Sequence, residues 1–223
     1  MPKVFIGVGH GGNDSGAVKY LVEKTINLEI AIHCRNLLLS NGVRVMLSRE
    51  KDENDPLTEE IQECNAFSPD LAVDIHSNAG GGDGFEAFYY HGGGKSKELA
   101  QNIEKEVIAI GQNSRGLKTK LNAQGKDYFG FIRQTKAPAV IVEGFFVDNE
   151  IDSKENQNKL KEFGEAYARG ILKTLGVKNI VKNEIENSKL YKVQIGAFKN
   201  RNNADIMANE LRDLGYEPII VQY

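Results

Sequence analysis

The chain has 223 residues, of which 40% are hydrophobic and 26% charged, with 23 glycines, five prolines and no tryptophan. This composition is typical of an ordinary globular protein and excludes disordered, collagen-like and disulfide-scaffold classes. The 28 basic and 31 acidic residues give a net charge of −3, so the overall charge offers no case for nucleic-acid binding.

The N-terminal segment predicts a buried strand rather than a targeting sequence. Its apolar residues, from Lys3 to Val8, are followed by a glycine-rich loop around His10. No apolar run approaches the roughly 18 residues that a membrane span requires. We therefore expect a protein made in the cytoplasm without a signal peptide and with no membrane span. Cys34 and Cys64 lack metal-site spacing and are expected to be buried, reduced thiols.

Predicted strands and helices alternate along the first three quarters of the chain. Asn41-Gly42 is a typical helix stop, and Ser68-Pro69 ends a second helix. This alternation predicts an α/β fold, a mostly parallel twisted sheet flanked by helices on both faces. The predicted strands cover 3–8, 43–47, 71–75, 85–90 and 139–142, and the predicted helices cover about 22–40, 57–67, 95–112 and 156–175.

The character of the sequence changes after Gly176. Residues 177–189 are polar and predict a linker. Residues 190–223 then predict a compact strand–helix–strand unit, with a helix over Asn202 to Leu214. We therefore expect a domain over 1–176, a linker over 177–189 and a small C-terminal βαβ unit over 190–223.

Ionisable residues stand at the carboxyl ends of three predicted parallel strands. They are His10, His76 and Glu143. In open α/β sheets the ligand crevice lies at that edge, and Glu23, at the start of the first helix, faces the same edge. Two imidazoles and one carboxylate can hold a catalytic Zn²⁺ and leave a fourth position for water. Glu143 would then remain as the base that accepts the proton.

Each of these residues also has a structural interpretation. His10 could be a turn residue, His76 a hydrogen-bonded structural histidine, and Glu23 a helix-start residue favoured by the macrodipole. Glu143 is harder to explain in this way, because a carboxylate between apolar segments is costly to bury without a partner. Together the four residues favour a hydrolytic site. Two further histidines are expected to lie outside it: His33 and His91.

Four segments in chain order carry a family resemblance: 9–17, 23–28, 74–79 and 142–149. Together they resemble the zinc-dependent N-acetylmuramoyl-L-alanine amidases of the amidase_3 type, over residues 3 to about 175. The resemblance implies that His10, Glu23 and His76 hold zinc and that Glu143 is catalytic. Two departures are mild: Asp-Ile-His-Ser-Asn stands where Ser-Ile-His-Ala-Asn is more usual, and Glu-Gly-Phe-Phe stands for Glu-Leu-Gly-Phe.

The tail resembles a second family. Tyr191 to Phe198, Asn203-Ala204 and Gly215-Tyr216 are similar to the opening half of a SPOR-type repeat, a module that binds peptidoglycan glycan strands stripped of stem peptides. A complete module has two such halves. The resemblance therefore implies either cell-wall binding or a homodimer in which two chains pair through residues 190–223.

The two resemblances imply a peptidoglycan hydrolase. It would cut the amide between the lactyl group of N-acetylmuramic acid and the L-alanine of the stem peptide, as a lytic enzyme of phage or of bacterial autolysis or sporulation. Such an enzyme acts on the cell wall after release from the cell. Two alternatives stay open at this point: a zinc peptidase acting on cell-wall peptides, and a non-catalytic cell-wall-binding protein.

Overall fold

A computed structural model describes residues 1–179, 195–213, 218 and 220. The chain divides into two compact units, Met1–Asn183 and Glu184–Tyr223, and each is described by itself. Within the described residues, no helix has the length and apolar character needed to cross a membrane.

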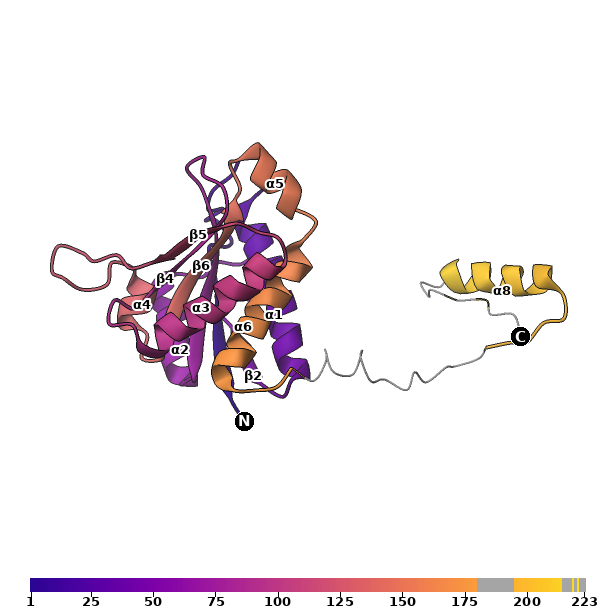
Figure 1. Ribbon diagram of the computed structural model, residues 1–223, viewed down its shortest axis with the longest axis horizontal. Coiled ribbons are helices and arrows are strands. Elements are labelled where there is room, and N and C mark those ends of the chain that lie inside the picture. The colour runs from indigo at the N-terminus through magenta and orange to yellow at the C-terminus, as the bar shows by residue number, and fades with distance from the viewer. Residues whose placement is uncertain (180–194, 214–217, 219, 221–223) are drawn as a thin grey trace. The chain divides into compact units, whose positions relative to one another are not determined.

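The N-terminal unit is built on one six-stranded sheet with the order β2-β1-β3-β6-β4-β5 (Figure 1). The neighbours β2, β1, β3 and β6 run parallel, whereas β4 runs antiparallel to β6 and β5 runs parallel to β4. The mostly parallel α/β fold expected from the sequence is thereby confirmed. The strands are β1 (Lys3–Val8), β2 (Arg44–Leu47), β3 (Leu71–Asn78), β4 (Phe85–Tyr89), β5 (Ser114–Lys118) and β6 (Ala139–Phe146).

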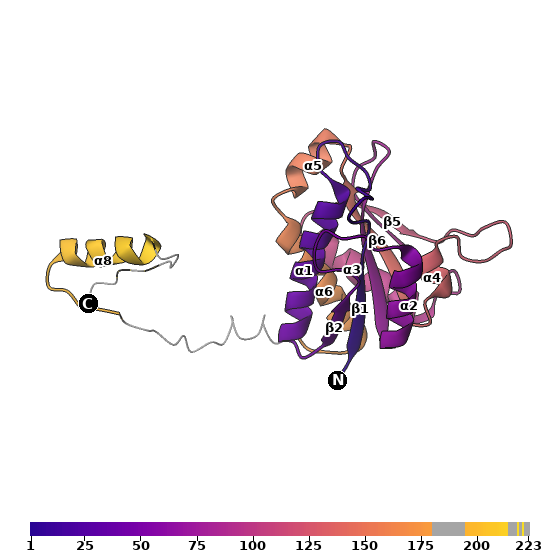
Figure 2. The same cartoon turned by 180° about the vertical axis from the view of Figure 1, so that it is seen from behind.

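Helices cover both faces of this sheet (Figures 1 and 2). On one face lie α1 (Glu23–Ser40), α3 (Gly94–Ala109) and α6 (Leu160–Leu175), and on the other lie α2 (Leu57–Phe67) and α4 (Gly130–Gln134). The short helix α5 (Glu150–Asn156) follows the end of β6. Cys34 on α1 and Cys64 on α2 are free and buried, as expected.

Strand side chains alternate between the two cores, and this alternation positions the site. Val4 and Ile6 of β1 point to the α1/α3/α6 face, and Phe5 points to the α2/α4 face. Ala72 and Ile141 also belong to the α2/α4 face. Side chains on a strand alternate between its two faces. Residues 74 and 76 of β3 and residue 143 of β6 therefore share the α2/α4 face with Ala72 and Ile141.

The sequence analysis missed three elements. The edge strand β5 has little apolar character and contains Gly116 at a φ of 90°, so its pairing with β4 rather than its composition defines it. Helix α4 lies in a stretch between residues 112 and 139 for which the sequence predicts no element. The helix expected over 156–175 is α6, and the short helix α5 that precedes it was missed. Asn149 caps α5 by accepting hydrogen bonds from the backbone N–H groups of residues 151 and 152, and α6 begins afresh at Leu160.

In the C-terminal unit, α8 (Arg201–Asp213) lies where the sequence predicts a helix. Its Ala208 is buried, whereas Ile206 is exposed. Most residues on either side of this helix in the expected strand–helix–strand unit, and most of the expected linker, lie outside the described residues, so the boundaries at 176 and 190 stay predictions.

Candidate functional site

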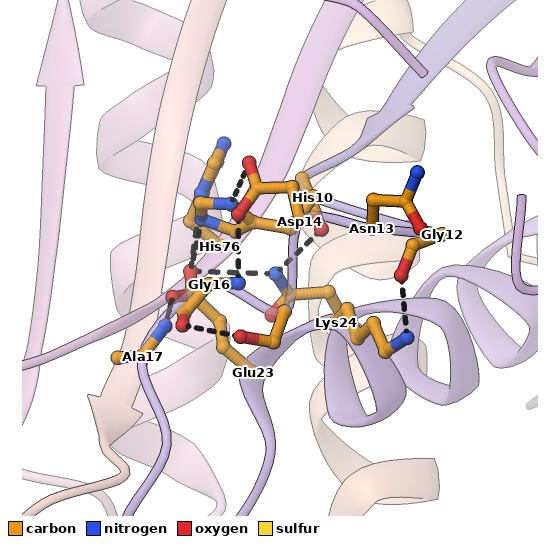
Figure 3. Close-up of polar contacts among 12 residues, drawn as sticks. His10, Gly12, Asn13, Asp14, Gly16, Ala17, Glu23, Lys24 and His76 are labelled. Carbon is orange, nitrogen blue, oxygen red and sulfur yellow. Dashed lines mark hydrogen bonds and ion pairs between the residues drawn. The ribbon is translucent and has the colours of Figure 1, made fainter. Parts of the chain in front are cut away.

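The carboxyl edge of the parallel strands brings three side chains to one point (Figure 3). His10 follows β1, Glu23 opens α1 and His76 lies near the end of β3. One potential ligand atom of each lies within 4.8 Å of the others. Glu23 Oε1 is 3.2 Å from His10 Nε2 and 3.2 Å from His76 Nδ1. Three residues far apart in the sequence thus form a compact N,N,O cluster.

Glycines in the surrounding backbone make this approach feasible. Gly16 has a φ of 62°, and a Cβ there would lie 2.6 Å from Glu23 Oε2 and 2.7 Å from the His10 ring. A Cβ on Gly9 would collide with the His76 ring. His10 itself occupies the left-handed region at a φ of 64°, which is uncommon for a residue with a side chain and is often found at functional sites. The loop is therefore shaped around the cluster.

Neighbouring polar groups fix the orientation of the cluster residues. His10 Nδ1 lies 2.9 Å from Asp14 Oδ2, which directs Nε2 towards Glu23. The backbone N–H groups of Ala17 and Ser77 donate to Glu23 Oε2 and Oε1, at 2.9 and 3.1 Å. Glu23 is 4% exposed and nevertheless keeps both carboxylate oxygens partnered.

Asn27 connects the same groups one helical turn after Glu23. Its amide donates to the carbonyl of Gly9 at 3.1 Å, and its Oδ1 accepts from the Ser77 hydroxyl at 2.9 Å. Asp14 and Asn27 lie inside the motifs found in the sequence but had no role assigned there. Their spacing could have identified them, because Asp14 follows His10 by four residues and Asn27 follows Glu23 by four residues.

The electrostatics of the cluster favour a bound cation. Burial raises the pKa of Glu23, but the imidazoles of His10 and His76 outweigh it and hold this pKa well below its usual range. The carboxylate of Glu23 raises the pKa of His10, and Asp14 raises it further. Burial lowers the pKa of His76, yet Asp74 and Glu23 hold it well above its usual range. The surrounding carboxylates thus favour the positively charged forms of both imidazoles.

The spacing and the donor set fit zinc. Ligand atoms bonded to zinc at 2.0–2.2 Å in a tetrahedron lie about 3.3–3.6 Å from each other. The two separations of 3.2 Å from Glu23 Oε1 are close to this edge length. Two imidazole nitrogens and one carboxylate oxygen are a normal catalytic zinc set, with a position left open. His10, Glu23 and His76 therefore suit a catalytic rather than a closed structural site.

Glu143 of β6 lies beside this cluster. It is in register with His76 of β3 on one side and with Glu86 of β4 on the other, so the three side chains share the α2/α4 face. Burial raises the pKa of Glu143 to about 8, and the negative charges of Glu23 and Glu86 act in the same direction. Glu86 differs, because Arg115 and Lys118 pair with its carboxylate and lower its pKa in spite of burial.

Comparison with known proteins identifies the family. The profile of the family described as N-acetylmuramoyl-L-alanine amidase (Amidase_3) matches residues 4–173. The chain belongs to this family. A second profile, that of the SPOR domain, matches residues 187–223. The amidase and SPOR resemblances predicted from the motifs are thereby confirmed.

Relatives and solved structures agree with this assignment. The amidase is 35% identical over 228 residues to N-acetylmuramoyl-L-alanine amidase CwlM of Bacillus licheniformis, which covers 99% of this chain and 85% of the relative. It is 37% identical over 226 residues, with the same coverage, to the sporulation-specific N-acetylmuramoyl-L-alanine amidase of Bacillus subtilis (strain 168). The solved catalytic domain of CwlV, an amidase from Bacillus (Paenibacillus) polymyxa var. colistinus, matches with a TM-score of 0.72 and 29% identity, over 80% of this chain and 100% of that one.

The remaining histidines of the amidase lie away from the cluster. His33 is on α1 and half-buried. His91 follows β4, whose antiparallel direction relative to β6 carries it to the opposite edge of the sheet. Its Nδ1 lies 2.8 Å from Asp127 Oδ2. Among the described residues, neither histidine joins a metal-ligand group.

Proposed function

We propose that this amidase cleaves the amide between the lactyl group of N-acetylmuramic acid and the L-alanine of the stem peptide. In this proposal His10, Glu23 and His76 hold a zinc ion, and Glu143 is the general acid and base. The observation that carries the proposal is the cluster itself, in which Glu23 Oε1 lies 3.2 Å from one nitrogen of each histidine. Glu143 lies in register with His76 beside it.

Each of these residues has a separate task. When bound, zinc supplies Lewis-acid activation of the scissile carbonyl and of the attacking water. Asp14 holds His10 in the tautomer that presents Nε2 to the site, and the backbone N–H groups of residues 17 and 77 hold the carboxylate of Glu23. Glu143 accepts the proton of the attacking water and delivers it to the departing alanine nitrogen.

Glu143 is suited to move a proton because burial and the neighbouring carboxylates outweigh the imidazole of His76 and disfavour the charged form of its carboxyl. Burial favours its neutral form and raises its pKa to about 8, far above that of an exposed glutamate. A nearby dication shifts such a pKa downward, towards the neutral range in which one group can both accept and return a proton. Glu86, neutralised by Arg115 and Lys118, has no such freedom.

The C-terminal unit holds the amidase on its polymeric substrate in this proposal. The SPOR match over residues 187–223 supports binding to peptidoglycan. We also keep the proposal that residues 190–223 of two chains pair into a homodimer, because the exposed Ile195, Phe198 and Ile206 give the described part of this unit an apolar surface. Cleavage would take place at the cell wall, outside the cytoplasm.

Digestion of purified cell walls tests the proposed cleavage. The zinc-loaded full chain should release new L-alanine amino termini, in proportion to the loss of turbidity. A peptidase acting on the same polymer would expose the amino termini of other residues instead. Chelation should stop the reaction and added zinc should restore it. Lysis without new alanine termini would reject the proposed bond, and lysis unaffected by chelation would reject the metal.

A further inference from the structure

Two cations of β5 lie on the same face of the sheet as Glu143. They are Arg115 and Lys118, and β5 is an edge strand that pairs with β4. Arg115 Nε lies 2.9 Å from Glu86 Oε2, and Lys118 Nζ pairs with the same oxygen. Glu86 in turn is directly opposite Glu143 on β6. The two cations therefore flank the proposed base on the side away from His76.

A β-bulge in β5 places both cations on this face. The register of β4 with β5 shifts next to Glu86, where two residues of β5, Arg115 and Gly116, stand against a single residue of β4. In a regular strand, residues three apart point to opposite faces. The extra residue brings Arg115 and Lys118 to the same face, and Gly116, at a φ of 90°, accommodates the bend. Bulges beside active sites commonly re-aim a side chain in this way.

The guanidinium of Arg115 is held in place but keeps one edge open. Its Nε donates to Glu86, and its Cζ lies 5.0 Å from the centroid of the Phe146 ring. Within the described part of the chain, its Nη1 and Nη2 donate no hydrogen bond. The side chain is 40% exposed, so this edge is accessible. A fixed guanidinium with two free N–H groups side by side is suited to a carboxylate, which it can bind through both oxygens.

The distribution of charge around the cluster favours an anion at this position. Among the described residues, Arg115 and Lys118 pair with one carboxylate, that of Glu86, which leaves an excess of one positive charge. Towards β1 and α2 the charge is reversed, because four carboxylic residues and, among the described residues, neither lysine nor arginine line the cavity beside the cluster. An anionic group of a substrate at the cluster is therefore attracted towards β5 and repelled from α2. The four carboxylic residues are Asp14, Asp55, Glu60 and Asp74.

We propose that the open edge of Arg115, with Lys118 beside it, binds a carboxylate of the substrate. This proposal rests on the proposed function, because the carboxylate would be the free α-carboxyl of the glutamate that follows the alanine in the stem peptide. That group lies about 6–8 Å from the scissile carbonyl along an extended chain. Strands about 4.8 Å apart put the backbone of Glu86 about 10 Å from that of His76, so a guanidinium bonded to Glu86 lies within this reach.

Two synthetic muropeptides that differ in one group test the subsite. Both carry a stem of L-alanine, γ-linked D-glutamate and L-lysine, and the α-carboxyl of the glutamate is free in one and amidated in the other. With the zinc-loaded full chain we expect kcat/KM to be about 10-fold higher for the free carboxyl, mostly through KM, because the amide loses a charge-assisted contact. Equal kcat/KM values for the two substrates would overturn the proposal without any variant.

Two variants localise the effect. Arg115→Gln should bring the ratio of the two kcat/KM values close to one, while Lys118 keeps the Glu86 carboxylate partnered. Lys126→Gln removes the same charge from an exposed position in the loop after β5 and should leave the ratio as in the parent chain. An Arg115→Gln chain that keeps the full preference for the free carboxyl would refute the contact. Loss of the preference in the Lys126→Gln chain would also refute it, because the effect would then follow net charge.

Direct binding separates this proposal from the proposed reaction. If the zinc-loaded chain cuts neither muropeptide nor purified cell walls, the proposed function fails. Calorimetric titration of the Glu143→Gln chain with each muropeptide then still tests the subsite. About 10-fold tighter binding of the free carboxyl, lost in the Arg115→Gln/Glu143→Gln chain, would support a carboxylate site, and equal affinities for the two muropeptides would exclude it.

Discussion

Replacing Glu143 by glutamine isolates proton transfer from every other property of the site. The amide keeps the shape and length of the carboxyl, so β6 should retain its register with His76 and Glu86. None of the three clustered residues is altered. The Glu143→Gln chain should therefore fold and bind zinc like the parent but lose the group that accepts a proton.

The expected loss of rate in the Glu143→Gln chain follows from the proposed role of Glu143 in proton transfer. A pKa of about 8 leaves roughly one carboxyl in ten ionised at pH 7 in the metal-free chain, and a cation at the cluster raises that share. The group is thus poised to take up and return a proton. Loss of one positioned acid–base group typically costs about 10²- to 10⁴-fold in rate, or about 2.7–5.4 kcal/mol of barrier.

Glu86→Gln is the matched control, because it removes a carboxylate from the position opposite Glu143 on the neighbouring strand. If Glu143 contributed only negative charge, the two variants would lose similar amounts of activity. If it moves a proton, Glu86→Gln should stay within a few-fold of the parent. The assay is release of alanine amino termini from purified walls, with zinc content measured on the same samples. A zinc-loaded Glu143→Gln chain with near-parental turnover would refute the assignment.

Three further predictions concern metal, stability and assembly. His10→Ala and His76→Ala should each lose zinc on dialysis, as measured by elemental analysis, since two protein ligands rarely retain it; stoichiometric zinc would make that histidine structural. Asp152→Ala should lower the free energy of unfolding in urea by about 3–5 kcal/mol, because this buried carboxylate accepts four hydrogen bonds, whereas exposed Glu155→Ala should change it little. Light scattering should find the full chain dimeric and a chain without residues 190–223 monomeric. If both chains are monomeric at tens of micromolar, the proposed dimer is excluded.

The sequence could predict that the cluster residues lie close together, because this depends on the topology of the sheet more than on the packing of individual side chains. Parallel strands end at one edge, so residues at the carboxyl ends of β1, β3 and β6 had to meet there. The register added what the sequence could not provide, namely that His76 and Glu143 are directly opposite. The roles of these residues as ligands and base stay proposals, although their proximity is now a structural observation.

Other features escaped the sequence because distant packing decides them. β5 has no strong strand pattern and exists through pairing with β4. Glu60 looks like any other glutamate in an acidic helical segment, next to the exposed Glu59. Its burial arises because α2 packs over Gly7 of β1, which offers no side chain to exclude it. No local periodicity encodes a contact between a helix and a glycine fifty residues earlier in the chain.

Three glutamates at this end of the sheet show how partners set the chemistry of one residue type. Glu23 is buried between two imidazoles and stays ionised, which suits a group that holds a cation. Glu86 is also held ionised, because Arg115 and Lys118 form ion pairs with its carboxylate and balance its negative charge. Glu143 alone of the three has a raised pKa, because burial and neighbouring carboxylates oppose its charge. Environments that push the pKa values of neighbouring acids apart are how an active site separates a metal ligand from a base, and the raised pKa of Glu143 supports its proposed role as the base.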